Sequence, residues 1–227
     1  MHDATTRYLQ TVDAVSDEAL AEPSVLPGWS RAHVVAHVAL NARGMTRALL
    51  GAAHRQPAPI YDSEAARDAD IEANARLAPG ALRDLSLDAC GRLREAFGLL
   101  GRLQPGATVD RLPGGPTFPA TGLVTMRWRE VEIHHADLDL DYGPHDWPEA
   151  FLDAIFNTVV HDRQEDAPML LRTPDGDVPI GDGSGPTITG TRPDLAWWLL
   201  GRGRGEHLSV DGELPTLGPW KRRTRAR

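Results

Sequence analysis

Glu130 and His134 are four residues apart in a segment that contains neither glycine nor proline. This segment runs from Leu123 to Leu140, and it predicts a helix that Thr121 can cap. Side chains at this spacing lie one turn apart on the same helix face, so the carboxylate and the imidazole can reach a single ion. The pair is therefore a candidate for two ligands of a metal site.

Spacing alone allows two other interpretations of this pair. It can be a surface ion pair worth roughly 0.2–0.5 kcal/mol, or it can act as a catalytic acid and base. The same helix stripe contains Leu123 and Met126, which predicts that this face turns toward a core. Because a buried charge needs a partner or a metal ion, a core position favours ligation, and a third ligand must then come from another helix.

A candidate for the third ligand lies in the segment from Arg31 to Leu50, which predicts a long helix capped by Ser30. Its His37 lies on or beside an apolar stripe, whereas His33 is one turn nearer the helix end, where we expect solvent. Together with the pair above, His37 gives two imidazoles and one carboxylate. Such a set is typical of a catalytic zinc site with an open fourth position, and other divalent ions also accept these ligands. A hydrogen-bonded core histidine is the alternative interpretation of His37.

A second pair in the same helix, Glu132 and His135, offers an alternative register for the site. These two residues lie on a different face from the Leu123 stripe, so the first pair is preferred. Asp137 can support a ligand through a hydrogen bond. Either His33 or His135 can carry a proton, and the sequence does not choose between them.

Two further helices are predicted in the first part of the chain, over Ala4 to Ala21 and over Ala81 to Leu103. With the two helices above they predict a four-helix bundle. The polar segment Ser63 to Ala75 is predicted to be a helix or a long ordered lid. The segment Gly106 to Pro119 is predicted to be a loop, because its glycines and prolines suit neither a helix nor a central strand.

The pattern changes after residues 142–148. Beyond them we expect helices from Glu149 to Asp162 and from Pro193 to Leu200, together with short strands. The predicted strands are Met169 to Arg172, Val178 to Ile180, Thr187 to Thr191 and Leu208 to Val210. The predicted fold class is α+β, with a four-helix bundle domain over residues 1–143 and a small α+β domain over residues 144–227.

Composition limits the classes of partner. The 227 residues carry a formal net charge of −8, which argues against nonspecific nucleic-acid binding. The sequence shows no signal sequence and no apolar run long enough for a membrane span, so we expect a cytoplasmic protein. Cys90 is the single cysteine and cannot form an intrachain disulfide. We expect a monomer, and we expect the basic segment Lys221 to Arg227 to be a solvated tail.

Four runs of the sequence carry a resemblance to a known family: Pro27 to Gly44, Tyr61 to Glu72, Arg129 to Leu138 and Asp194 to Arg202. They resemble the DinB-like metal-binding four-helix bundles and, more narrowly, the mycothiol-dependent maleylpyruvate isomerases with their sterol-carrier-like C-terminal region. The resemblance covers nearly the whole chain. Asn41 and the run from Asp68 to Glu72 are its more specific part.

The resemblance implies that zinc is held by His37, Glu130 and His134. It also implies an enzyme that converts maleylpyruvate to fumarylpyruvate with mycothiol, within gentisate breakdown. A thiolate can add to the cis double bond, allow rotation about the resulting single bond, and leave to give the trans product. We interpret Cys90 as a packed thiol, so an external thiol, deprotonated by a metal ion, is the expected nucleophile.

A dicarboxylate substrate needs cationic or amide partners. Arg202, which follows Gly201, is the first choice, since an arginine of the second domain could close over the bundle site. Asn41 can hydrogen-bond substrate or thiol, or can be structural. Other candidates, each expected on the surface, are Arg83, Arg127 and Arg204. The alternative functions are another mycothiol-dependent thiol transferase and a noncatalytic metal- or ligand-binding protein.

Overall fold

The computed structural model describes residues 1–218 and 220. It divides into two compact units, Met1–Asp139 and a second unit that begins at Leu140. The first unit is mainly helical, and the second combines helices with a sheet. The fold is therefore α+β, as predicted. Within the described part of the chain, no helix is long and apolar enough to cross a membrane. The basic segment Lys221 to Arg227 lies outside the described residues.

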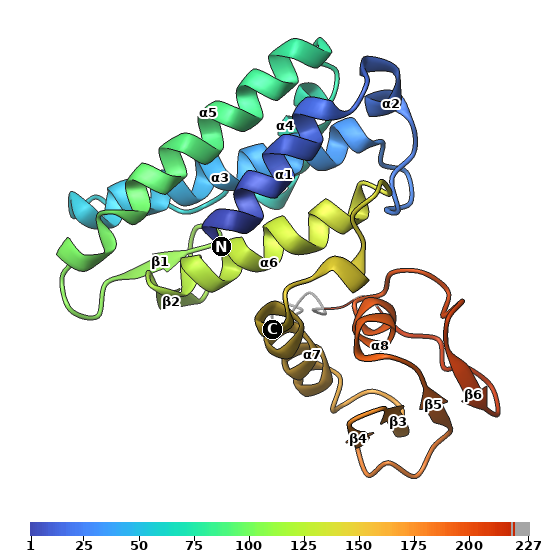
Figure 1. Cartoon of the computed structure of the whole chain (residues 1–227). Helices are drawn as coiled ribbons and strands as arrows, with labels where there is room; N and C mark the ends of the chain where they lie inside the picture. Colours follow the sequence, from blue (N-terminus) through green and yellow to red (C-terminus); the bar gives the residue numbers. More distant parts are fainter. Residues whose placement is uncertain (219, 221–227) are drawn as a thin grey trace. The chain divides into compact units, whose positions relative to one another are not determined.

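Four helices of the first unit run lengthwise beside one another (Figure 1). Helix α3 packs against α5 and α6, and α1 packs against the same two helices. Apolar side chains at helical spacing form their shared core. The four helices are α1 (His2–Ala14), α3 (Arg31–Ala53), α5 (Pro79–Phe97) and α6 (Gly122–Asp137). Residues almost completely buried between them include Tyr8, Val12, Val34, Val38, Met45, Leu93 and Leu123.

The single helix predicted over Ala4 to Ala21 is wrong. Helix α1 ends at Ala14, and the backbone of Val15 is extended. Ser16 then begins a new helix, α2 (Asp17–Ala21), because its side chain accepts a hydrogen bond from the backbone N–H of Ala19 at 3.2 Å.

Two other predicted boundaries also need correction. The helix predicted to reach Leu103 ends at Phe97 and is followed by a short 3-10 helix, η1 (Leu100–Arg102). The predicted loop Gly106 to Pro119 contains an antiparallel hairpin of β1 (Thr108–Asp110) and β2 (Thr117–Pro119). The run from Pro113 to Pro116 lies in the turn between these strands, so the irregular segment is shorter than predicted.

The segment predicted as a helix or a lid is helix α4 (Glu64–Asn74), which Ser63 caps by accepting a hydrogen bond from the N–H of Ala66. The connection that leads into α4 passes very close to α3. A Cβ atom on Gly44 would lie 2.4 Å from the carbonyl oxygen of Ile60, so only glycine permits this approach. The contact places Tyr61, the next residue, beside the middle of α3.

The second unit contains a four-stranded sheet in the order β4-β3-β5-β6, and two helices that pack on each other. Strands β3 and β4 form a hairpin, β5 runs parallel to β3, and β6 is antiparallel to β5. The elements are η2 (Pro144–Asp146), α7 (Glu149–Asp162), β3 (Met169–Thr173), β4 (Gly176–Ile180), β5 (Thr187–Thr189), α8 (Arg192–Leu199) and β6 (Ser209–Asp211). These elements correspond to the predicted helices and strands within a few residues.

Candidate metal centre

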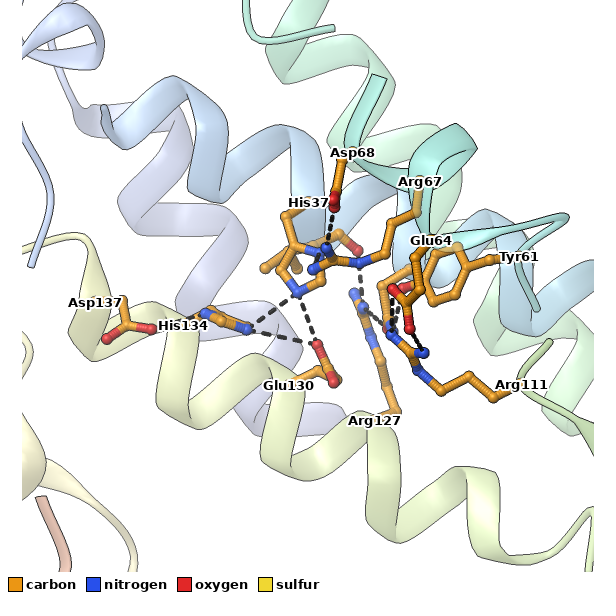
Figure 2. A network of polar contacts seen from close by, with 12 residues as sticks. His37, Tyr61, Glu64, Arg67, Asp68, Arg111, Arg127, Glu130, His134 and Asp137 are labelled. Atoms are coloured by element: carbon orange, nitrogen blue, oxygen red, sulfur yellow. Dashed lines mark hydrogen bonds and ion pairs between the residues drawn. The ribbon is translucent and has the colours of Figure 1, made fainter. Parts of the chain in front are cut away.

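The three predicted ligands come together between α3 and α6 (Figure 2). Nε2 of His37 lies 3.0 Å from Oε2 of Glu130 and 3.1 Å from Nε2 of His134. Nε2 of His134 lies 3.5 Å from the same oxygen of Glu130. All three candidate ligand atoms lie within 4.8 Å of one another, so the side chains converge on one point.

The spacing and chemistry of this set fit a divalent ion. Zinc binds imidazole nitrogen and carboxylate oxygen at about 2.0–2.2 Å, which places tetrahedral ligand atoms about 3.3–3.5 Å apart. The observed separations of 3.0, 3.1 and 3.5 Å are close to that spacing. A small contraction is expected when hydrogen bonds, rather than a cation, hold the three groups together.

The helix stripe that holds the pair lies at the edge of the core rather than inside it. Leu123 is fully buried, but Met126, Glu130 and His134 are only half-buried. The side chain of His37 is 5% exposed, whereas that of Glu130 is 26% exposed. The Glu130 side of the triad is therefore the more exposed side, from which a ligand can approach.

Asp137 lies behind His134. Its Oδ2 atom is 2.8 Å from Nδ1 of His134, and its side chain is fully buried. A carboxylate at this nitrogen holds a proton on Nδ1, so Nε2, which faces His37 and Glu130, is the ring nitrogen left to bind an ion. The predicted supporting role of Asp137 thus has the geometry that it requires.

The ionisation of the triad follows from burial and mutual contacts. Burial, together with His134 and Arg67, lowers the pKa of His37 to about 4. Burial alone would raise the pKa of Glu130, but hydrogen bonds from the two histidines hold it well below the ordinary value. Burial opposes charge on His134 as well, but the hydrogen bonds to Asp137 and Glu130 raise its pKa. His37 is thus a neutral ligand and Glu130 an anionic one at neutral pH.

Arg67 of α4 faces the other ring nitrogen of His37. Its Nη2 atom lies 3.3 Å from Nδ1 of His37, and its Nη1 atom lies 2.7 Å from Oδ1 of Asp68. The Nε atom of Arg67 is buried and has no hydrogen-bond partner among the described residues. Arg67 was not among the predicted site residues, because no spacing rule connects α4 with the helices that carry the triad.

Tyr61 lies against the same arginine, with the guanidinium carbon of Arg67 5.7 Å from the centre of its ring. Burial and the nearby Glu130 raise the pKa of Tyr61, so its hydroxyl stays protonated. Tyr61 and Arg67 both line a cavity of about 220 Å³, whose other charged lining residues are Arg43, Arg47, Asp62 and Asp70. Arg47 forms an ion pair with Asp62. Through Arg67, the triad therefore borders a small polar cavity with a slight excess of positive charge.

Asn41 connects Tyr61 to the interior of the bundle. Its Nδ2 donates to the hydroxyl of Tyr61 at 3.2 Å, and its Oδ1 accepts from Nη1 of Arg127 at 2.9 Å. The expectation that Arg127 lies on the surface is wrong, because it is 1% exposed and also donates to the carbonyl of Val38. Asn41 thus connects the hydroxyl of Tyr61, which lines the cavity, to the buried guanidinium of Arg127.

The other two predicted arginines have different surroundings. Arg83 donates to the carbonyls of Val12 and Val15 and to the carboxylate of Asp17, so it fastens α5 to the break between α1 and α2. Arg202 belongs to the second unit, where Nη1 donates to the carbonyl of Leu200 at 3.1 Å. The binding roles predicted for these two arginines remain predictions.

The alternative register of the metal pair faces away from His37. Oε1 of Glu132 accepts from Arg7 and from Trp128, and Nε2 of His135 lies 2.8 Å from the hydroxyl of Thr11. Arg7 and Thr11 both belong to α1, so Glu132 and His135 join α6 to that helix. These contacts of Glu132 Oε1 and His135 Nε2 hold the bundle together.

The sequence and the fold are similar to those of known proteins. The family model of the mycothiol maleylpyruvate isomerase N-terminal domain matches residues 1–139. Among solved structures, the mycothiol-dependent maleylpyruvate isomerase is 27% identical, with a TM-score of 0.84 over 96% of this chain and 93% of that chain. A histidine-to-alanine mutant of such an isomerase gives the same TM-score and coverage at 26% identity. No curated protein matches. Because the family model spans well over half of the residues, the chain belongs to the family of the mycothiol maleylpyruvate isomerase N-terminal domain.

Proposed function

We propose that this protein is a mycothiol-dependent maleylpyruvate isomerase, which forms fumarylpyruvate within gentisate breakdown. The observation that carries the proposal is the convergence of His37, Glu130 and His134 beside Arg67, which also lines a small polar cavity. Family membership and the likeness to solved isomerases support the same conclusion. The reaction adds a thiolate to a cis double bond, allows rotation, and eliminates the thiolate to leave the trans product.

Two imidazoles and one carboxylate would hold zinc, with another divalent metal as an alternative, and leave a coordination position open. Such an ion, when bound, would supply positive charge that lowers the pKa of a thiol. His37 would contribute a neutral imidazole, since burial keeps its pKa low. Glu130 would contribute the negative charge, and Asp137 would hold His134 in the required tautomer.

Arg67 is the side chain best placed to bind a carboxylate of the substrate. If Nε2 of His37 binds the ion, Nδ1 of the same ring carries the proton and no longer accepts a hydrogen bond from Arg67. The guanidinium is then available for an anion, and it already has a buried Nε without a partner. A guanidinium binds carboxylate in a planar, two-pronged arrangement, which suits a dicarboxylate substrate.

Tyr61 and Asn41 are proposed to act together at the carbonyl group of the substrate. Negative charge develops on that oxygen when a nucleophile adds to the conjugated double bond. The protonated hydroxyl of Tyr61 can donate to it, and Asn41 fixes the position of that hydroxyl. Arg202 stays the proposed second cation for the substrate.

The test measures the turnover of maleylpyruvate by the purified protein, with and without mycothiol, before and after removal of metal by a chelator. We expect activity only when thiol and metal are both present. Glu130→Gln should lose bound zinc and turnover while keeping its helical circular dichroism. Glu95→Gln, an exposed change on α5, should keep both and is the matched control.

Two results would contradict the proposal in different ways. Equal turnover by metal-free Glu130→Gln protein would exclude the metal mechanism. No turnover by protein that binds zinc stoichiometrically would exclude this substrate but keep the metal site, and a panel of other thiol acceptors would then be assayed.

A further inference from the structure

A second cavity lies between α1 and α5 and is larger than the one beside the metal centre. Its volume is about 370 Å³, and its walls are mainly apolar. Cavities of about 300–1,000 Å³ are the usual size for small-molecule sites. Leu9, Leu87, Leu93 and Phe97 supply the apolar surface, and the side chain of Leu87 extends to solvent with 62% of its residue area exposed.

The charged groups of this cavity are all of one sign. Arg94 and Arg127 line it, and none of the described lining residues is acidic. Arg127 is 1% exposed, and its hydrogen bonds go to a carbonyl, to the amide of Asn41 and to the sulfur of Cys90. None of these acceptors is a carboxylate. A buried cation without an anionic partner is costly, so the cavity is suited to an anion.

We propose that this cavity is a second binding site, distinct from the metal centre, for a small amphipathic monoanion with an alkyl chain and one carboxylate. The chain lies against the leucines and Phe97, and the carboxylate lies against the guanidinium of Arg127 or Arg94. The size of the cavity, its apolar wall and its unbalanced positive charge all select this class of ligand.

Cys90 reports directly on the cavity. It is the only cysteine of the chain, it lines the cavity wall, and its sulfur accepts from Nη2 of Arg127 at 3.2 Å. A ligand in the cavity must therefore shield Cys90. Octanoate is the probe, and octanol, with the same chain and no charge, is its neutral counterpart. The rate of Cys90 alkylation by iodoacetamide is measured by mass spectrometry while each compound is titrated.

Gly91 offers a variant that fills the cavity. It lines the wall, and a Cβ atom built on it has no neighbour within 4 Å, so Gly91→Leu can enter the space without a clash. Leucine also has a higher helix propensity than glycine, which protects the fold. Gly80→Leu is the matched control, because it lies on the same helix, has equally open surroundings and is not among the lining residues.

Octanoate should slow the alkylation of Cys90 in a saturable way in the unchanged protein and in Gly80→Leu. Calorimetry should show that Gly91→Leu weakens octanoate binding about tenfold or more. In the unchanged protein, octanol should bind more weakly than octanoate by a similar factor, because it cannot form the charge-assisted contact. Unchanged alkylation at saturating octanoate would overturn the site. Equal binding of octanol and octanoate would overturn the assignment of an anion.

Discussion

Nδ1 of His134 lies 2.8 Å from Oδ2 of Asp137, a carboxylate that is completely buried. This contact fixes the imidazole so that its other nitrogen faces His37 and Glu130. Asp137→Asn keeps the size of the side chain but removes the charge that holds the proton on Nδ1. We expect zinc affinity to fall about 10–100-fold, the usual effect of losing such a partner, measured by competition with a chromophoric chelator.

The control for that change is Asp139→Asn, just beyond the end of the same helix. Asp139 has a positive φ of 55°, a conformation that asparagine also adopts readily, so the fold should be unaffected. Zinc affinity equal to that of the unchanged protein in both variants would show that Asp137 does not support the ligand.

Arg67→Gln tests whether this guanidinium binds the substrate. We expect kcat/KM for maleylpyruvate to fall roughly 10–100-fold, since a hydrogen bond to a charged group is worth about 1.5–3 kcal/mol. Zinc affinity should stay the same or rise, because the change removes a positive charge that repels a cation beside His37. Arg76→Gln, whose side chain is 75% exposed and pairs with Glu72, is the control and should change neither quantity. A large loss of zinc from Arg67→Gln would instead assign Arg67 to the integrity of the site.

Asn41→Ala separates a structural role of this residue from a catalytic one. The change leaves Arg127 without one acceptor and Tyr61 without its donor, so we expect a loss of about 1–3 kcal/mol in the free energy of unfolding by urea. If Asn41 also positions Tyr61 for catalysis, kcat should fall in the folded fraction at saturating substrate. Asn74→Ala, which removes only an exposed side-chain bond to the carbonyl of Asp70, is the control. An unchanged kcat would leave Asn41 with a structural role alone.

The convergence of His37, Glu130 and His134 could be predicted because helical spacing determines which side chains share a face. Glu130 and His134 are one turn apart, and His37 lies beside an apolar stripe, so two helices indicated three candidate ligands. The neighbouring cavity could not be predicted in this way. Arg67 reaches His37 from α4, and this approach depends on the packing of Ile60 against Gly44, which no periodic pattern records.

The burial of Arg127 also could not be predicted from the sequence. An arginine is expected at the surface because burial of its charge is costly. Here it is enclosed by neutral acceptors from α3 and α5, which cannot be read from the sequence of α6 alone. The end of α1 was also not predicted, because apolar residues continue at helical spacing beyond it. The backbone of Val15 is extended, and Ser16 caps the separate helix α2.

Arg202→Gln tests the proposed contribution of the second unit. Arg202 is not a metal ligand, so zinc affinity should be unchanged, whereas kcat/KM should fall about 10–100-fold if its guanidinium binds a substrate carboxylate. Arg172→Gln, an exposed change on β3 of the same unit, is the control and should change neither quantity. Unchanged kcat/KM in Arg202→Gln would remove Arg202 from the substrate site and leave Arg67 as the proposed cation.

The low pKa of His37 predicts how the metal-free protein responds to acid. Between the ordinary value of 6.5 and about 4, His37 is neutral in the folded protein but charged in the unfolded chain. The unfolded state therefore binds more protons in this range, and the contribution of His37 to stability is complete above pH 6.5 and is lost as the pH falls toward 4. Each pH unit in the window corresponds to about 1.4 kcal/mol at most.

Two measurements check this expectation. Two-dimensional NMR of the imidazole nitrogens should give a midpoint for His37 near 4 in the metal-free protein. Urea unfolding at pH 7 and pH 5 should show that His37→Gln loses less stability on acidification than the unchanged protein. The contribution of His37 must be taken from the difference in stability loss between these two proteins. The raised pKa of His134 acts in the opposite direction in both, because it stabilises the fold at low pH. A midpoint for His37 near 6.5 would mean that the ring is solvated, which is incompatible with a buried ligand poised to bind metal in its neutral form.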